Sequence, residues 1–209
     1  MTKKSNYSGG TISRRGLIYG STIPPLAAAG LSGCNFNKPA GGDSPKNDYS
    51  FELDEISIQQ IKQAFKDGTY TSEKITKLYL DRIEALDKQG PELHSIIETN
   101  PDALEIAREM DREMKEKGSR GPLHGIPVVL KDNIDTHDKM TTTAGSLALE
   151  GSIPAVDSEV ARRLKEAGAI ILAKANLSEW ANFRSLTSSS GWSGRGGPVS
   201  YTHLRAHET

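Results

Sequence analysis

The chain has 209 residues, which is long enough for one domain with a hydrophobic core. Its 26 Lys and Arg residues nearly balance its 27 Asp and Glu residues, giving a net charge of −1. No basic excess points to nucleic acid as a partner. No stretch reaches the roughly 18 apolar residues of a membrane-spanning helix, so a globular chain is expected.

The first 34 residues have the order of a signal peptide, with a polar, basic start followed by a mildly apolar stretch. The adjacent Arg14 and Arg15 resemble a twin-arginine export signal. The sequence "LSGC", residues 31–34, resembles the lipobox of bacterial lipoproteins, in which the cysteine carries lipid. We therefore expect residues 1–34 to form a signal peptide, Cys34 to be lipidated, and the protein to be an exported lipoprotein anchored to the membrane of the bacterial cell envelope. The alternative is a disordered tail that contains these motifs by chance.

A flexible linker is predicted next, because residues 35–50 are rich in Gly, Pro, Asn, Asp and Ser. Apolar residues at helical spacing then predict two helices, over 54–68 and 71–90. The β-branched stretch 94–99 predicts a strand, and residues 100–118 predict a helix with Asn100 as its cap.

The remaining elements predict a strand–helix–strand unit. The stretch "IPVVLKD", residues 126–132, reads as a buried strand, and 169–175 as a second. A helix over 157–168 connects them, with Val160, Ala161 and Leu164 facing inward. Such a unit predicts parallel strands, whose carboxyl ends are where sites gather. Lys131 and Lys174 both fall at or near those ends.

Lys131 ends a segment that is otherwise apolar, and a buried ammonium group is costly unless it is paired or neutralised. It could pair with Asp132 or Asp135, or bend toward solvent. It could instead be a neutral base that takes a proton from a serine hydroxyl, as in Ser-Lys variants of the catalytic triad. The spacing of the residues leaves both readings open.

Several consecutive motifs over about residues 53–197 resemble the amidase signature family, and among its branches the peptide amidases. They are "GPLHGIPVVLKDNID", "TTTAGSLAL", "DSEVARRLKEAGAIILAKANLSEWA" and "SGWSGRGG". The resemblance implies the amino-terminal part of an α/β fold, with a mixed, largely parallel sheet flanked by helices. It also implies hydrolysis of small-molecule or peptide amides by a Ser–cis-Ser–Lys triad, without metal or cofactor. Lys131 matches the catalytic lysine of that triad.

The sequence departs from the family pattern after Gly197. Neither family motif that carries a catalytic serine occurs in this chain, so we expect a fragment of the amidase domain, residues 51–197, that lacks activity. Residues 198–209 do not match the family and are interpreted as a non-native tail. The serines at 188, 189, 190 and 193 are not assigned to the triad and are expected to form a polar turn that lines the site. His124 is expected to make a structural hydrogen bond, and the spacing of His203 and His207 is interpreted as chance.

Two other functions fit parts of the sequence. One is a membrane-tethered binding or scaffold protein without catalysis. The other is the amidase component of a tRNA-dependent amidotransferase, which shares the signature. The predicted export signal argues against the amidotransferase, because its work is cytosolic.

Overall fold

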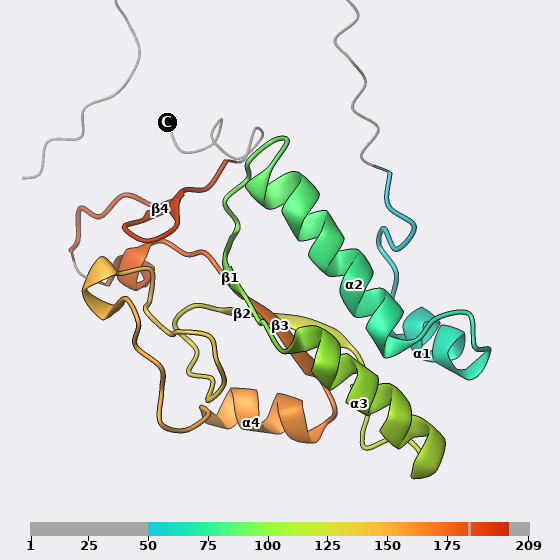
Figure 1. Cartoon of the computed structure of the whole chain (residues 1–209). Helices are drawn as coiled ribbons and strands as arrows, with labels where there is room; N and C mark the ends of the chain where they lie inside the picture. The colour runs from blue at the N-terminus through green and yellow to red at the C-terminus, as the bar shows by residue number, and fades with distance from the viewer. Residues whose placement is uncertain (1–49, 184, 201–209) are drawn as a thin grey trace, which may run out of the picture. The chain divides into compact units, whose positions relative to one another are not determined.

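The computed structural model describes residues 50–183 and 185–200. Within them a small sheet is flanked by helices (Figure 1). The predicted signal peptide 1–34, with Cys34, and the predicted linker 35–50 except for its last residue lie outside the described residues, as do His203 and His207. In chain order the elements are α1 Ile58–Lys66, α2 Ser72–Ile83, a π-helical turn Glu84–Lys88, β1 Ile96–Thr99, α3 Ala103–Glu116, β2 Pro127–Lys131, a 3₁₀ turn Leu147–Leu149, α4 Glu159–Glu166, β3 Ile170–Ala175, a 3₁₀ turn Glu179–Asn182, β4 Trp192–Ser193 and β5 Gly197–Pro198.

The three larger strands form a mixed sheet in the order β1-β3-β2. β2 and β3 are parallel and are joined through α4, as the strand–helix–strand pattern predicts. β1 runs antiparallel to β3 and places Glu98 opposite Lys174. The predicted α/β fold class, with a mixed sheet flanked by helices, is confirmed.

Side-chain caps fix where most of the helices begin. Ser57 and Gln60 form a reciprocal capping box at α1, and Thr71 and Ser158 cap α2 and α4. The expected cap of α3 is wrong. Asn100 is buried, and its side chain accepts from the backbone N–H of Asp102 and donates to a carbonyl of β3, so it stabilises the turn before the helix rather than the first turn of the helix itself.

The core consists of three apolar clusters around the sheet. One lies between α3 and β3, another joins α1 and α2 to β2, and the last joins α4 to β2 and β3. Ala161 of α4 is fully buried, but Val160 is 54% exposed, so its inward placement was wrong. The helix turns about 100° per residue, and Ala161 and the half-buried Leu164 occupy the face toward the sheet.

β2 is an edge strand, and this corrects the expectation that its segment is buried throughout. Leu130 is buried, but Val129 is 40% exposed and Lys131 is exposed, because successive side chains of a strand point to opposite faces. Large apolar side chains elsewhere are also exposed, and Phe183 reaches 91%. None of the described helices is long and apolar enough to cross a bilayer.

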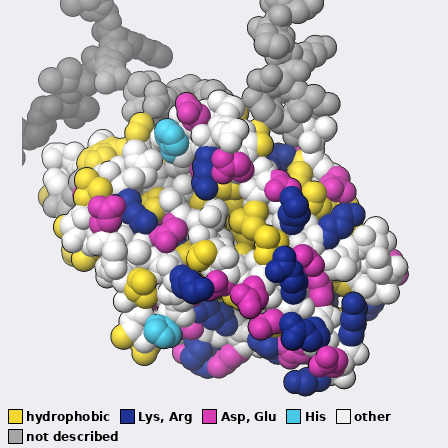
Figure 2. All heavy atoms as spheres, in the orientation of Figure 1, with side chains coloured by type: hydrophobic (Ala, Val, Ile, Leu, Met, Phe, Trp, Pro, Cys, Tyr) yellow, Lys and Arg dark blue, Asp and Glu magenta, His cyan; other side chains and the backbone are white. Residues whose placement is uncertain are grey.

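Charges of both signs cover the face shown in Figure 2. Lys and Arg side chains are interleaved with Asp and Glu side chains, and hydrophobic groups gather between them. On this face no patch of one sign forms, in keeping with the near-neutral net charge.

The central position of β3 yields a stability prediction. Ile170 is fully buried there, so Ile170→Ala should lower the free energy of unfolding by about 2–5 kcal/mol through lost burial and a residual cavity. The exposed Val160→Ala is the matched control and should change it by less than about 0.5 kcal/mol. Urea unfolding followed by circular dichroism measures both, and equal losses would contradict the packing described.

Candidate functional site at the carboxyl ends of β2 and β3

Lys131 ends β2 and lies opposite Ala175, the last residue of β3. Its side chain is exposed. Among the described residues it forms no ion pair with Asp132 or Asp135 and no hydrogen bond. The described structure therefore agrees with one of the outcomes expected for Lys131, a side chain that bends toward solvent. The considered burial of Lys131 is therefore wrong for the described residues, and its role as a base stays a prediction.

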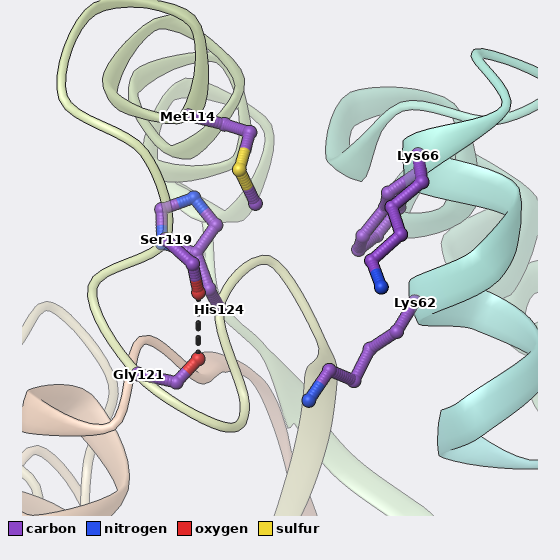
Figure 3. Close-up of a pocket in the computed structure, with 7 residues that line it drawn as sticks. Lys62, Lys66, Met114, Ser119, Gly121 and His124 are labelled. Atoms are coloured by element: carbon purple, nitrogen blue, oxygen red, sulfur yellow. Dashed lines mark hydrogen bonds between the residues drawn. The ribbon is translucent and has the colours of Figure 1, made fainter.

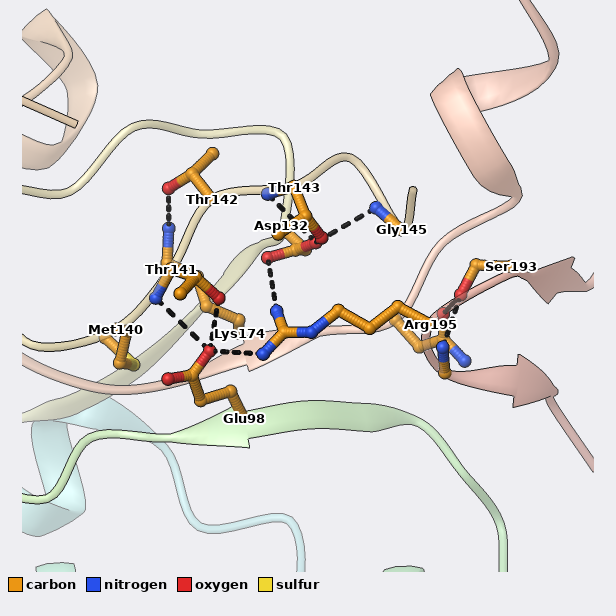
Figure 4. Close-up of polar contacts among 12 residues, drawn as sticks. Glu98, Asp132, Met140, Thr141, Thr142, Thr143, Gly145, Lys174, Ser193 and Arg195 are labelled. Atoms are coloured by element: carbon orange, nitrogen blue, oxygen red, sulfur yellow. Dashed lines mark hydrogen bonds and ion pairs between the residues drawn. The ribbon is translucent and has the colours of Figure 1, made fainter. Parts of the chain in front are cut away.

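The residue after Lys131 is the centre of a buried polar network (Figure 4). Asp132 is fully buried. Its carboxylate oxygen Oδ2 accepts hydrogen bonds from the hydroxyl of Thr143 and from the backbone N–H of Gly145 at 3.0 Å. Its backbone carbonyl accepts from the N–H groups of Thr143 and Ala144 at 3.2 and 3.0 Å. A buried carboxylate is tolerated only when donors surround it, so these bonds hold the 143–145 turn against the end of β2.

Gly145 is required at this turn for two reasons. Its φ is +73°, in the left-handed region that favours glycine. A Cβ atom at this position would also lie 2.5 Å from the Cβ of Ser193. The turn that carries Asp132's donors is therefore packed directly against the serine- and glycine-rich segment.

Lys174 is the lysine that the fold buries. It lies in the central strand β3 and is fully buried. Its ammonium group donates to the carbonyl of Ile134 at 2.6 Å and to the hydroxyl of Thr142 at 2.8 Å. Burial lowers the pKa of Lys174, and the negative charge of Asp132 offsets part of that shift. Lys174 thus ties together the two ends of the 134–142 loop that follows β2.

Arg195 brings a cation from the glycine-rich turn to the same cluster. Its Nη2 donates to Glu98 at 2.8 Å, and its Nη1 lies 3.9 Å from Asp132 Oδ1. Thr141 donates to the same Glu98 oxygen through its hydroxyl at 2.6 Å. Burial raises the pKa of Glu98, but the hydrogen bonds from Thr141 and Arg195 outweigh it and hold that pKa below its usual value.

Two atoms of this cluster have no hydrogen-bond partner among the described residues. They are Asp132 Oδ1 and Arg195 Nη1, which face each other across 3.9 Å. Their separation is beyond hydrogen-bonding distance, so they interact by charge alone. Both keep unused hydrogen-bonding capacity at the edge where Lys131 lies.

Ser193 has a structural role in the described residues. It is buried, and its hydroxyl donates to Asn176 Oδ1 at 2.8 Å and accepts from the N–H of Gly196 at 2.9 Å. These bonds hold the β4–β5 hairpin beside the end of β3, in agreement with the expected polar turn. His124 lies at the other end of β2, where its two ring nitrogens bond to the backbone of Arg120 and Met110, as expected for a structural histidine.

The sequence predicted that Lys131 and Lys174 lie at or near the carboxyl ends of neighbouring strands, and the structure confirms that placement. The sequence did not reveal that Glu98, Asp132, Thr143 and Arg195 form one network. Asp132, Thr143 and Arg195 stand in the quoted motifs, at the polar turn after the strand, in "TTTAGS" and in "SGRGG", whereas Glu98 lies outside them in the predicted strand 94–99. The described residues contain no group of three or more His, Cys, Asp or Glu that could hold a metal ion.

The fold of the described residues is similar to that of solved amidases. The peptide amidase of Stenotrophomonas maltophilia superposes with a TM-score of 0.69 at 51% identity, covering 72% of this chain and 30% of that one. An amidase family protein of Bacillus anthracis gives 0.67 at 40% identity, covering 71% and 29%. These matches define the class of the fold as that of the amidases.

The family model described as Amidase matches residues 74–198, more than half of the chain, and the chain therefore belongs to the amidase family. A probable amidase of Arabidopsis thaliana is 51% identical over 149 residues, covering 70% of this chain and 28% of that protein. A glutamyl-tRNA(Gln) amidotransferase subunit from Gloeothece citriformis is 42% identical over 137 residues, covering 65% and 27%. The chain spans about a quarter to a third of the length of these relatives.

The charge network predicts a pH-dependent contribution to stability. Because the pKa of Glu98 is lowered in the folded chain, its stabilising effect is present above its ordinary value near 4.5 and is lost as the pH falls through the lower folded value. Glu98→Gln should lower the free energy of unfolding by about 1–3 kcal/mol at pH 7, and this difference from the wild type should shrink below pH 4.5. Urea unfolding at several pH values measures it. The exposed Glu150→Gln serves as control, and a pH-independent loss in Glu98→Gln would contradict the assignment.

Proposed function

We propose that the chain is the amino-terminal part of an exported amide hydrolase in which Lys131 is the catalytic base. Membership of the amidase family supports the reaction class, and the observation that carries the proposal is the position of Lys131. It ends a parallel strand directly before the buried Asp132, whose hydrogen bonds hold the adjoining turn. That places an amine on rigid backbone at the edge of the sheet where α/β proteins build their sites.

In the proposed reaction, neutral Lys131 takes a proton from a bridging serine, which in turn activates a nucleophilic serine. That serine attacks the amide carbonyl, the proton taken by Lys131 returns to the leaving nitrogen, and ammonia or an amine leaves. Water then hydrolyses the acyl-enzyme to the carboxylate and regenerates the serine. The resemblance implies that both serines lie in motifs absent from these 209 residues. We therefore propose that the chain by itself has no amidase activity.

The substrate class is proposed to be a peptide amide or small-molecule amide. It is supported by structural neighbours that are peptide amidases, one of them solved in complex with the competitive inhibitor chymostatin. A second candidate is a component of an amidotransferase, supported by the 42% identity to such a protein. The 51% identity to amidases and the predicted export signal favour the hydrolase.

The test of Lys131 uses a full-length enzyme. In a chimera, residues 51–197 of this chain replace the matching part of the Stenotrophomonas peptide amidase, to which the chain is 51% identical. Lys131→Ala should lower kcat for a peptide amide by about 10²–10⁴-fold, the range of general-base catalysis. Lys131→Arg should lower kcat to a similar extent, because a guanidinium group keeps its proton near neutral pH.

The exposed Lys139→Ala is the matched control and should retain the activity of the chimera. Circular dichroism should show that all variants fold alike. Turnover by either Lys131 variant within a factor of about three of the parent chimera would disprove the assignment of the base, since general-base catalysis contributes far more than that.

We propose that the protein is exported and anchored to the membrane by lipid, on the basis of the twin arginines and the cysteine of the predicted lipobox. Expression of the whole chain in a suitable bacterium should give a product that incorporates labelled fatty acid and sediments with membranes. Cys34→Ala should abolish the label and release the protein from the membrane fraction. Unlabelled wild-type protein in the cytosol would refute both the export signal and the lipid anchor.

A further inference from the structure

A hollow of about 200 Å³ lies at the amino end of β2, the opposite end of the strand from Lys131 (Figure 3). Helices α1 and α3 and the loop before β2 form its walls. The residues that line it are Lys62, Phe65, Lys66, Met114, Ser119, Gly121 and His124. The amide-hydrolase proposal uses none of them.

The walls of the hollow are mostly apolar, and their polar groups are already satisfied. The aromatic ring of Phe65 and the thioether of Met114 supply apolar surface. His124 accepts from the N–H of Arg120 at 3.0 Å and donates to the carbonyl of Met110 at 2.9 Å. The hydroxyl of Ser119 donates to the carbonyl of Gly121 at 2.9 Å. An apolar group could therefore enter the hollow without displacing a needed hydrogen bond.

Two cations line the hollow and have no ion-pair partner among the described residues. Lys62 and Lys66 are one helical turn apart on α1, and Figure 3 shows both ammonium groups directed into the gap between α1 and the 119–124 loop. Neither forms an ion pair or a hydrogen bond with a described residue, and the described lining of the hollow contains no acidic side chain. Like charges at this spacing repel each other, so an anion held between them would relieve the repulsion.

We propose that this hollow is a binding site for a small amphipathic monocarboxylate. Its apolar body would pack against Phe65 and Met114, and its carboxylate would lie between the ammonium groups of Lys62 and Lys66. The volume is below the roughly 300–1,000 Å³ of sites for drug-sized ligands, so the ligand is a single ring or a short chain. The inference rests on the hollow and its charges and is independent of the proposed amidase reaction.

The test compares two probes that differ in charge and hardly in shape, phenylacetate and phenylacetamide. Each is titrated into the ¹⁵N-labelled whole chain and followed by NMR. Phenylacetate should bind at least about tenfold more tightly, because charge-assisted hydrogen bonds form only with the carboxylate. Its largest shifts should fall on the amides of Lys62, Lys66, Ser119 and Gly121.

The double variant Lys62→Met/Lys66→Met keeps the apolar stems and removes both charges. It should lose the preference for phenylacetate and bind both probes equally weakly. The matched control, Lys77→Met/Lys115→Met, removes two lysines elsewhere and should bind phenylacetate like the wild type. Thermal unfolding gives a second measurement, since phenylacetate should raise the Tm of the wild type and the control but not that of the double variant.

Equal affinity for the two probes would overturn the proposal, as would an equal loss in the control variant or shifts confined to other parts of the chain. Absence of phenylacetate binding in both the NMR and the thermal measurements would do the same.

Discussion

The buried carboxylate of Asp132 is the constraint on which the structure at the carboxyl ends of β2 and β3 depends. A desolvated carboxylate must be met by donors, and those of Asp132 come from Thr143 and Gly145, 11 and 13 residues later in the chain. The chain between them therefore has to return to the end of β2. Gly145 in turn contacts Ser193 so closely that the glycine-rich segment is held in the same place. A single buried charge thus organises three separate stretches of sequence around the residue that follows Lys131.

Lys131 and Lys174 show how neighbouring strands give the same residue type different environments. Lys174 lies in the central strand, where burial lowers its pKa and two oxygen acceptors hold its ammonium group. Lys131 ends the edge strand and faces solvent. Lys174 connects the loop after β2 to the sheet, and Lys131 lies exposed at the end of its strand. The two ends of β2 also differ, since the apolar hollow with its pair of lysine ammonium groups lies at the end opposite Lys131.

Much of the fold followed from local patterns. The apolar periodicity of α1 and α2 predicted these two helices, and the strand–helix–strand order around α4 predicted the parallel pairing of β2 with β3. The antiparallel β1, the exposed Val129 and the exposed Val160 were not predictable in this way. They depend on which strand occupies the centre of the sheet and which helix face meets it, and neither property is carried by a short window of sequence.

The sequence by itself determined the family, the type of fold and the position of Lys131 at the carboxyl end of a strand, because motifs and hydrophobic periods are local properties. Only the tertiary structure decided that Asp132 is the centre of a network, that Lys174 rather than Lys131 is the buried lysine, and that Arg195 reaches Glu98 across 97 residues of chain. The physical reason is that burial and charge pairing arise between segments distant in sequence. The cost of desolvating a charge, and the partner that offsets it, exist only once those segments are packed together.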